Sequence, residues 1–265
     1  MQHWDFLQNK CQKFSRSPCA AHLGKEKISM GLNRKTARLA GLLWLLMIGL
    51  GLFAQIGVRE SIIIPGNATA TAANIAANSF LFRLGFVSDL AMLICYLLTP
   101  LVFYKLFLTV SKNLSALMVI FAMVGTAIGM LSLLCEYAAL HLLTGAPYLS
   151  AFSTSQLQAQ AMLLLELNDH GYMIAHIFFA LWVLPLGILI YRSGFLPRVF
   201  GILFILETIA GLLSITIHFL FPGGTLETNL LWLGAIAEFS FTFWILLRGI
   251  REPKAGILQP EPLRA

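Results

Sequence analysis

The sequence predicts an all-α polytopic membrane protein that folds as a six-helix transmembrane bundle. Hydrophobic residues make up 58% of the 265 residues and charged residues only 11%, whereas a soluble domain is usually about a quarter charged. The apolar residues fall into six runs, each near the ~20 residues with which a helix crosses the membrane hydrocarbon. The net charge is +6, and the basic residues stand at the ends of these runs, where they indicate topology rather than a nucleic-acid surface.

The spans lie within one membrane domain, residues 33–250. Residues 1–32 show no hydrophobic periodicity and are expected to be a disordered polar extension, with Met30 as an alternative start to Met1. Residues 251–265 are expected to form a cytoplasmic tail. The six spans are predicted at 39–58, 83–104, 114–138, 171–191, 199–220 and 229–248.

The distribution of Lys and Arg selects one orientation. With the N-terminus in the cytoplasm, every Lys and Arg except Arg59 and Arg83 falls in a segment on the inner side. The positive-inside rule therefore predicts a multi-pass protein of the cell membrane with both termini in the cytoplasm. The long connections 59–82 and 139–170 then lie outside.

Both outer connections contain helical patterns. Residues 68–78 predict a short helix. Residues 155–169 are amphipathic, with Ser155 as a candidate N-cap. This second segment is expected either to lie on the outer membrane surface or to lead into the fourth span.

Small and polar residues recur at helical spacing along most spans. Lipid gives membrane helices no hydrophobic reason to associate, so such stripes are expected to form the packing seams, with Leu, Ile and Phe facing lipid. Examples are Trp44, Ile48, Gly51 and Gln55 in the first span, Gly125, Gly129, Ser132 and Glu136 in the third, and His176, Ala180, Val183 and Gly187 in the fourth.

Three acids are predicted to lie inside the membrane. Glu207 and Glu238 are equally far from the turn between the last two spans, which places both about 13 Å deep and facing each other. Two such carboxyl groups would share a proton or hold a cation, or would simply link the helices as neutral groups. Asp89 has no charged residue opposite it in the next span, so it needs a partner from another helix or a water-filled cavity.

Two further polar pairs follow from the same depth argument. Arg83 and Glu136 are expected to meet near the outer surface as a structural ion pair. His176 and Ser214 are expected to share one level, as a hydrogen-bonded pair or, alternatively, as a proton relay.

Motifs for catalysis and metal binding are not found in the sequence. It contains neither GxSxG nor HExxH, and its four cysteines form no CxxC pair, so no catalytic residue, disulfide framework or cofactor is predicted. The outer connection contains His141, Glu166, Asp169 and His170. Glu166 and His170 have the i, i+4 spacing of a metal-ligand pair, but solvation of an exposed surface explains them better, and no metal site is predicted.

Three short motifs resemble a bacterial membrane family called domain of unknown function 4386. They are NRKTARLAG (33–41), FRLGFVSDL (82–90) and YRSGFLPR (191–198). The resemblance covers residues 33–250, supports the membrane architecture and places Arg83 and Asp89 in a family motif, but it implies no activity. Family members begin close to the first motif, so residues 1–30 depart from the pattern.

The sequence leaves three functions open. The first is binding or movement of a small solute or proton through a polar bundle interior formed by Asp89, Glu207 and Glu238. The second is a structural or regulatory membrane subunit whose polar residues only hold the helices together. The third, an intramembrane enzyme, has no recognisable nucleophile or metal site in its favour. The oligomeric state does not follow from the sequence.

Overall fold

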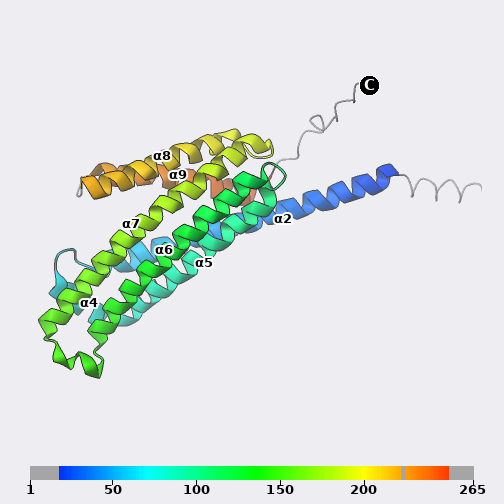
Figure 1. Ribbon diagram of the computed structural model, residues 1–265. Coiled ribbons are helices and arrows are strands. Elements are labelled where there is room, and N and C mark those ends of the chain that lie inside the picture. The colour runs from blue at the N-terminus through cyan, green and yellow to red at the C-terminus, as the bar shows by residue number, and fades with distance from the viewer. Residues whose placement is uncertain (1–17, 222–224, 251–265) are drawn as a thin grey trace, which may run out of the picture.

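The computed structural model describes residues 18–221 and 225–250, which form helices and short turns (Figure 1). The membrane helices begin with α2 (Pro18–Leu52), which continues into the π-helix η1 (Phe53–Arg59) and the single turn α3 (Glu60–Ile62). The remaining elements are α4 (Ala68–Ala77), α5 (Ser79–Phe107), α6 (Lys112–Thr144), the 3₁₀ turn η2 (Pro147–Ala151), α7 (Thr154–Ser193), α8 (Arg198–Leu220) and α9 (Thr225–Leu247). The all-α prediction is confirmed.

The six long helices of the described chain form a closed ring. Each of α5, α6, α7 and α8 packs against the next helix in the sequence, and α2 closes the ring by packing against both α5 and α9. The helix ends that carry Lys105, Lys112, Arg192 and Arg198 lie at one end of the bundle, here called the basic end. The opposite end, called the far end, carries α4 and η2 (Figure 1).

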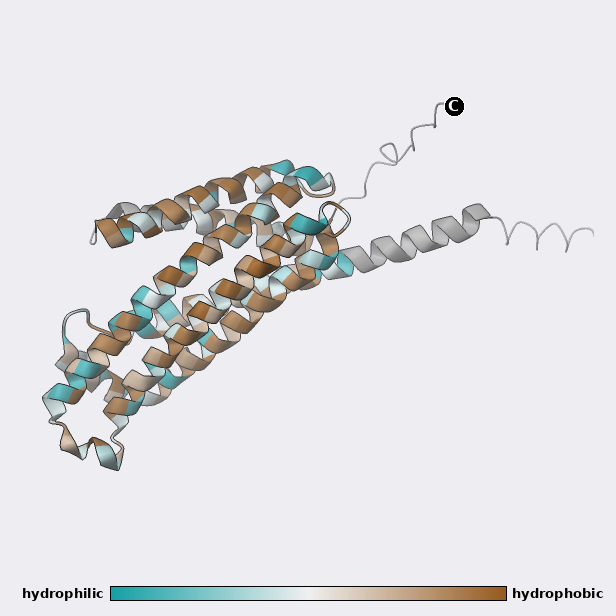
Figure 2. Cartoon of the chain, in the orientation of Figure 1, coloured by the Kyte–Doolittle hydropathy of each residue, from teal (hydrophilic) through white to brown (hydrophobic). Residues whose placement is uncertain are grey.

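The helices have the length and surface of membrane spans. Among the residues that the structure describes, five helices are long and apolar enough to cross a membrane, and a shorter apolar stretch, Trp232–Leu247, lies within α9. Hydrophobic residues follow these helices along most of their length (Figure 2). Large side chains such as Leu131 and Leu134 of α6 are more than 60% exposed, as expected for groups that contact lipid. The chain is therefore a multi-pass membrane protein.

Helix α7 joins the predicted outer helix and the fourth span without a break. Its 40 residues reach about 60 Å at 1.5 Å per residue, about twice the hydrocarbon thickness. The N-cap is Ser153 rather than the predicted Ser155, because Ser153 and Gln156 form a reciprocal capping box. Of the two alternatives for residues 155–169, the structure shows the one in which they lead into the span.

The first span differs from its prediction at both ends. Helix α2 begins at Pro18, so residues 18–32 are helical rather than disordered, whereas residues 1–17 lie outside the described chain. At the other end the α-helix changes to the π-helix η1, and the helical segment continues to Ile62 instead of ending at residue 58. The π turn is wider than an α turn and is frequent at functional sites.

An aromatic cluster fills the bundle core toward the basic end. Trp44 of α2 is fully buried, and its ring lies 5.2 to 5.7 Å from those of Phe103, Trp182, Phe204 and Phe241. These side chains come from four different helices. Close helix contacts need glycine here, because a Cβ on Gly201 would lie 2.6 Å from the Gly187 carbonyl oxygen.

Candidate functional site

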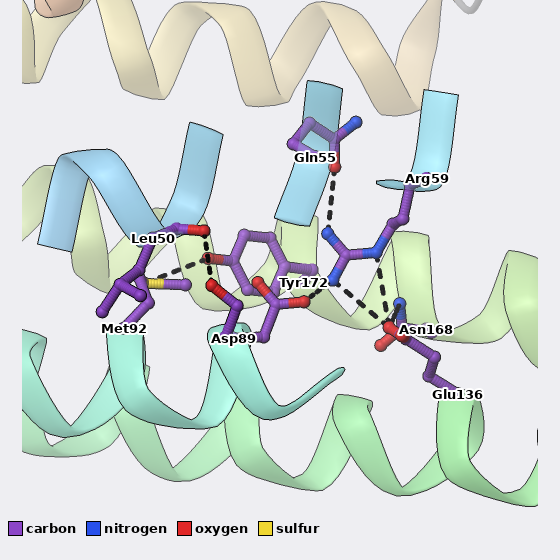
Figure 3. Close-up of polar contacts among 9 residues, drawn as sticks. Leu50, Gln55, Arg59, Asp89, Met92, Glu136, Asn168 and Tyr172 are labelled. Atoms are coloured by element: carbon purple, nitrogen blue, oxygen red, sulfur yellow. Dashed lines mark hydrogen bonds and ion pairs between the residues drawn. The ribbon is translucent and has the colours of Figure 1, made fainter. Parts of the chain in front are cut away.

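Arg59 enters the bundle at the last position of the π-helix. Its neighbour Val58 is buried, and the Arg59 side chain is only 17% exposed. The guanidinium Nη1 donates to Gln55 Oε1 at 3.1 Å, four residues earlier on the same helix (Figure 3). The guanidinium is thus held at the edge of the bundle interior by its own helical segment.

Two carboxylates from two other helices bind this guanidinium. Asp89 of α5 forms a hydrogen-bonded ion pair with Arg59 Nη2. Glu136 of α6 accepts from Arg59 Nε at 3.3 Å and from Nη2 at 3.2 Å, and Asn168 of α7 donates to the same Glu136 oxygen at 3.4 Å. Arg59, Asp89 and Glu136 are called the charged network below; with Asn168 they connect four elements.

The charged network is almost fully shielded from solvent on its acidic side. Asp89 and Glu136 are each 2% exposed. Tyr172 of α7 lies beside Asp89, and its hydroxyl reaches Met92 Sδ at 3.9 Å (Figure 3). A buried charge is costly unless it is paired and hydrogen-bonded, so these contacts explain how the two acids are accommodated.

A pocket of about 300 Å³ opens beside the charged network at the far end. Arg59 and Tyr172 line it, together with the apolar side chains Ile63, Pro65, Met162 and Leu165. Its remaining lining residues include three carboxylates, Glu60, Glu166 and Asp169, and also Gln55, Asn168 and His170. The pocket therefore offers mostly negative groups, and its single guanidinium is already paired with acids.

The predicted ion pair between Arg83 and Glu136 does not form. Arg83 is exposed on α5, while Glu136 is ion-paired with Arg59. Counting across one loop compares only the two helices that the loop joins, here α5 and α6. Arg59 comes from a third segment, η1. Arg59 also forms an ion pair with Asp89, so it is the partner from another helix that Asp89 was expected to need.

Glu207 and Glu238 meet as the turn geometry predicts. Their carboxyl groups lie close enough to interact electrostatically, and Trp44 Nε1 donates to Glu238 Oε2 at 3.4 Å. Glu207 packs against Gly234, where an added Cβ would lie 3.1 Å from Glu207 Cγ. In the described chain, Glu207 Oε2 is buried without a hydrogen-bond partner.

His176 of α7 and Ser214 of α8, predicted to share one level, lie between two contacts that join these helices. Contacts on either side bracket them: Thr208 Oγ1 donates to the Ala180 carbonyl at 3.1 Å, and His218 meets His170 nearer the far end. Ser214 is fully buried. The His176 ring nitrogen Nδ1 lies 3.3 Å from the Tyr172 carbonyl oxygen on its own helix.

The predicted acids form two separate groups rather than one site. Asp89 belongs to the charged network beside the pocket, whereas Glu207 and Glu238 are not among the pocket's lining residues and lie next to Trp44. Tyr96 lies between the groups, because the centre of its ring is 4.3 Å from that of Phe179, which contacts Tyr172, and 5.6 Å from that of Trp182, which contacts Trp44. The Tyr96 hydroxyl donates to the Phe179 carbonyl at 3.3 Å.

Sequence reasoning missed four residues of the site: Gln55 as a partner, Arg59, Asn168 and Tyr172. The signal was present in the helical spacing of the packing stripes, had they been continued toward the far end of the bundle. One step of four residues after Gln55 reaches Arg59, and steps of four before His176 reach Tyr172 and Asn168.

The comparisons with known proteins identify the family but no activity. A family model described as "Domain of unknown function (DUF4386)" matches residues 39–249, which is most of the chain. No curated protein and no solved structure matches. The matched range contains all six long helices from the middle of α2 to the end of α9, together with the charged network and its pocket. The chain therefore belongs to the DUF4386 family of membrane proteins.

Proposed function

We propose that the protein binds a small cationic solute, or a proton, in the pocket at the far end of the bundle. The observation that carries this proposal is the pocket, which is about 300 Å³ in volume. Its lining combines three carboxylates with Arg59, which is already ion-paired with two buried acids. The sequence-based hypothesis placed binding in the polar interior of the bundle, and the proposal here places the binding site in one pocket.

The charges favour a cation over an anion. Arg59 supplies one positive charge to the charged network, while Asp89 and Glu136 supply two carboxyl groups. One carboxyl group thus has no full counter-charge inside the network, and a proton or a second cation would balance it. The carboxylates Glu60, Glu166 and Asp169 extend the same preference to the pocket wall.

The apolar part of the lining favours a small organic cation. Ligand pockets generally combine apolar walls with a few placed polar groups. Here Leu165, Met162 and Ile63 would contact hydrocarbon groups, and the ring of Tyr172 offers a π face to an ammonium group. A volume of about 300 Å³ lies at the small end of the usual range for ligand pockets.

Binding is supported more strongly than passage through the bundle. The aromatic cluster around Trp44 fills the core between the pocket and the basic end, so a solute could pass only if these rings separated. The pair Glu207 and Glu238 lies beside Trp44, where it would serve as a second proton or cation site. We further infer from the positive-inside rule that the basic end faces the cytoplasm and the pocket opens outside the cell.

A structural role is the alternative, and one observation favours it. Every member of the charged network has a partner, and the network connects η1, α5 and α6, with Asn168 adding α7. Polar contacts between membrane helices are worth about 0.6 to 2 kcal/mol each, so this arrangement could serve stability alone. In that case substitutions should change stability without changing binding.

Two binding measurements separate these functions. Purified protein in lipid nanodiscs, stripped of metals with EDTA, is titrated calorimetrically with tetraethylammonium chloride against a sodium chloride control. Proteoliposomes containing a pH-sensitive dye are given an acid pulse to measure the protons bound. The variants are Asp89→Asn and Glu166→Gln, and Arg83→Gln is the matched control because Arg83 is exposed on the same helix as Asp89.

We expect tetraethylammonium to bind the native protein and the Arg83→Gln control, with affinity reduced at least about tenfold in Glu166→Gln. We expect the Asp89→Asn variant to bind fewer protons after the pulse. Absence of tetraethylammonium binding, together with unchanged proton binding in Asp89→Asn, would refute the proposal and favour the structural role.

A further inference from the structure

We infer that the far end of the bundle carries a binding site for one divalent transition-metal ion, such as Zn²⁺, formed by Asp169, His170 and His218. Spacing along one segment does not reveal this cluster, because His218 lies 48 residues beyond His170 and belongs to a different span. Folding brings the three residues together: Asp169 and His170 come from α7, and His218 comes from the last turn of α8.

The spacing of the ligand atoms suits a metal ion. One ligand atom from each residue lies within 4.8 Å of the others. The two ring nitrogens, His170 Nδ1 and His218 Nε2, are 3.5 Å apart. Two nitrogens bound to Zn²⁺ at 2.0–2.1 Å with a tetrahedral angle lie about 3.4 Å apart, so the imidazoles already have the required separation. Asp169 is exposed, so its carboxylate is free to rotate toward the ion.

The donor atoms of the three side chains indicate which metal ions the site would bind. Two imidazoles with one carboxylate bind Zn²⁺ and other late first-row ions, whereas Ca²⁺ and Mg²⁺ prefer all-oxygen sites. Three protein ligands leave a fourth position for water or another small ligand. Asp169 and His170 also line the pocket beside Arg59, so this open position lies next to the pocket.

His141, another histidine near the far end, does not belong to this cluster. His141 of α6 lies 2.8 Å from the Tyr148 hydroxyl, so it belongs to a different contact and is not a member of the triad. Phe219 packs beside the triad, with its ring 5.0 Å from that of His218 and 6.3 Å from that of His170. An apolar neighbour of this kind restricts solvent around a metal site and strengthens its electrostatic contacts.

This inference stands independently of the cationic-solute proposal. The metal site needs His218, which does not line the pocket, and it does not need the charged network. A bound ion would connect α7 to α8 at the far end, where the two helices otherwise meet through exposed or half-buried side chains.

The test uses the full chain with a tag that contains no histidine, purified in detergent and stripped with EDTA. Zn²⁺ is titrated calorimetrically, and Co²⁺ is added separately to record the visible absorption of a tetrahedral site. The variants are His170→Ala, His218→Ala and Asp169→Asn, with His141→Ala as the matched control. His218→Cys is included because a cysteine thiolate also binds Zn²⁺ and should preserve the site.

We expect one Zn²⁺ per chain and a tetrahedral Co²⁺ spectrum. Loss of an outer-shell partner costs about 10- to 100-fold in metal affinity, so removing a direct ligand should cost at least about tenfold in each of the three variants. His141→Ala and His218→Cys should retain binding. Three results would overturn the inference: no Zn²⁺ binding, equal loss in His141→Ala, or unchanged binding in His170→Ala and His218→Ala. The last two would assign Zn²⁺ to other groups, and the first would leave the two histidines as a hydrogen-bonded pair.

Discussion

Replacing Arg59 with glutamine removes the positive charge on which Asp89 and Glu136 depend. The side chains of both acids are 3% exposed, so water cannot replace the lost counter-charge. Breaking a buried ion pair by removing one partner costs about 3–5 kcal/mol. In a chain of this size 1 kcal/mol corresponds to about 2–4 °C in the unfolding midpoint, so Arg59→Gln should lower the midpoint by about 6–20 °C.

The assay is thermal unfolding in one detergent, followed by intrinsic tryptophan fluorescence. Arg83→Gln is the control, and because Arg83 is exposed we expect it to change the free energy of unfolding by no more than about 0.5 kcal/mol. The triple variant Arg59→Met, Asp89→Asn, Glu136→Gln removes every charge and should recover most of the loss. A midpoint for Arg59→Gln within about 2 °C of the native protein would refute the assignment of Arg59 as the partner of both acids.

Three further predictions use other parts of the bundle. Gly201→Val should destabilise the protein by at least about 1–3 kcal/mol, because a Cβ there would lie 2.6 Å from a backbone oxygen of α7, whereas Gly49→Ala, with nothing within 4 Å, should be tolerated in the same unfolding assay. Trp44→Ala should cost about 3–5 kcal/mol by the same assay, since it empties the centre of the aromatic cluster; a loss under about 1 kcal/mol would contradict that packing. Saturating Zn²⁺ should weaken tetraethylammonium binding in calorimetry by adding positive charge beside the pocket, and His218→Ala should abolish this effect; equal weakening in that variant would contradict the adjacency of the two sites.

The architecture could be predicted from the sequence because it depends on local features. Span length and apolar runs predict membrane helices one at a time, and the turn between α8 and α9 places Glu207 opposite Glu238 by simple counting. These inferences need only the spacing along one helix or across one loop.

Helical spacing could have added Arg59 to the packing stripe of the first span, but its pairing with Asp89 and Glu136 depends on two features that spacing does not reveal. The change to a π-helix before Arg59 alters which side chains face the bundle, and nothing in the residues FAQIGVR specifies a π turn over an α turn. The network also joins residues from three separate segments, so counting across one loop assigned Glu136 to Arg83. The metal-site cluster also joins separate segments, so spacing along one helix does not connect His218 with Asp169 and His170.

The ring of helices also has a consequence for the order in which the protein is built. Because each helix from α5 to α9 packs against its sequence neighbour, most of the wall can form while the chain is still being inserted. Helix α9 arrives last and closes the gap between α8 and α2. Until then Glu207 lacks Gly234 and Glu238, and Trp44 lacks the carboxylate to which it donates. A nascent chain that stops before α9 therefore holds a carboxyl group and an indole N–H within the membrane without the partners that α9 provides.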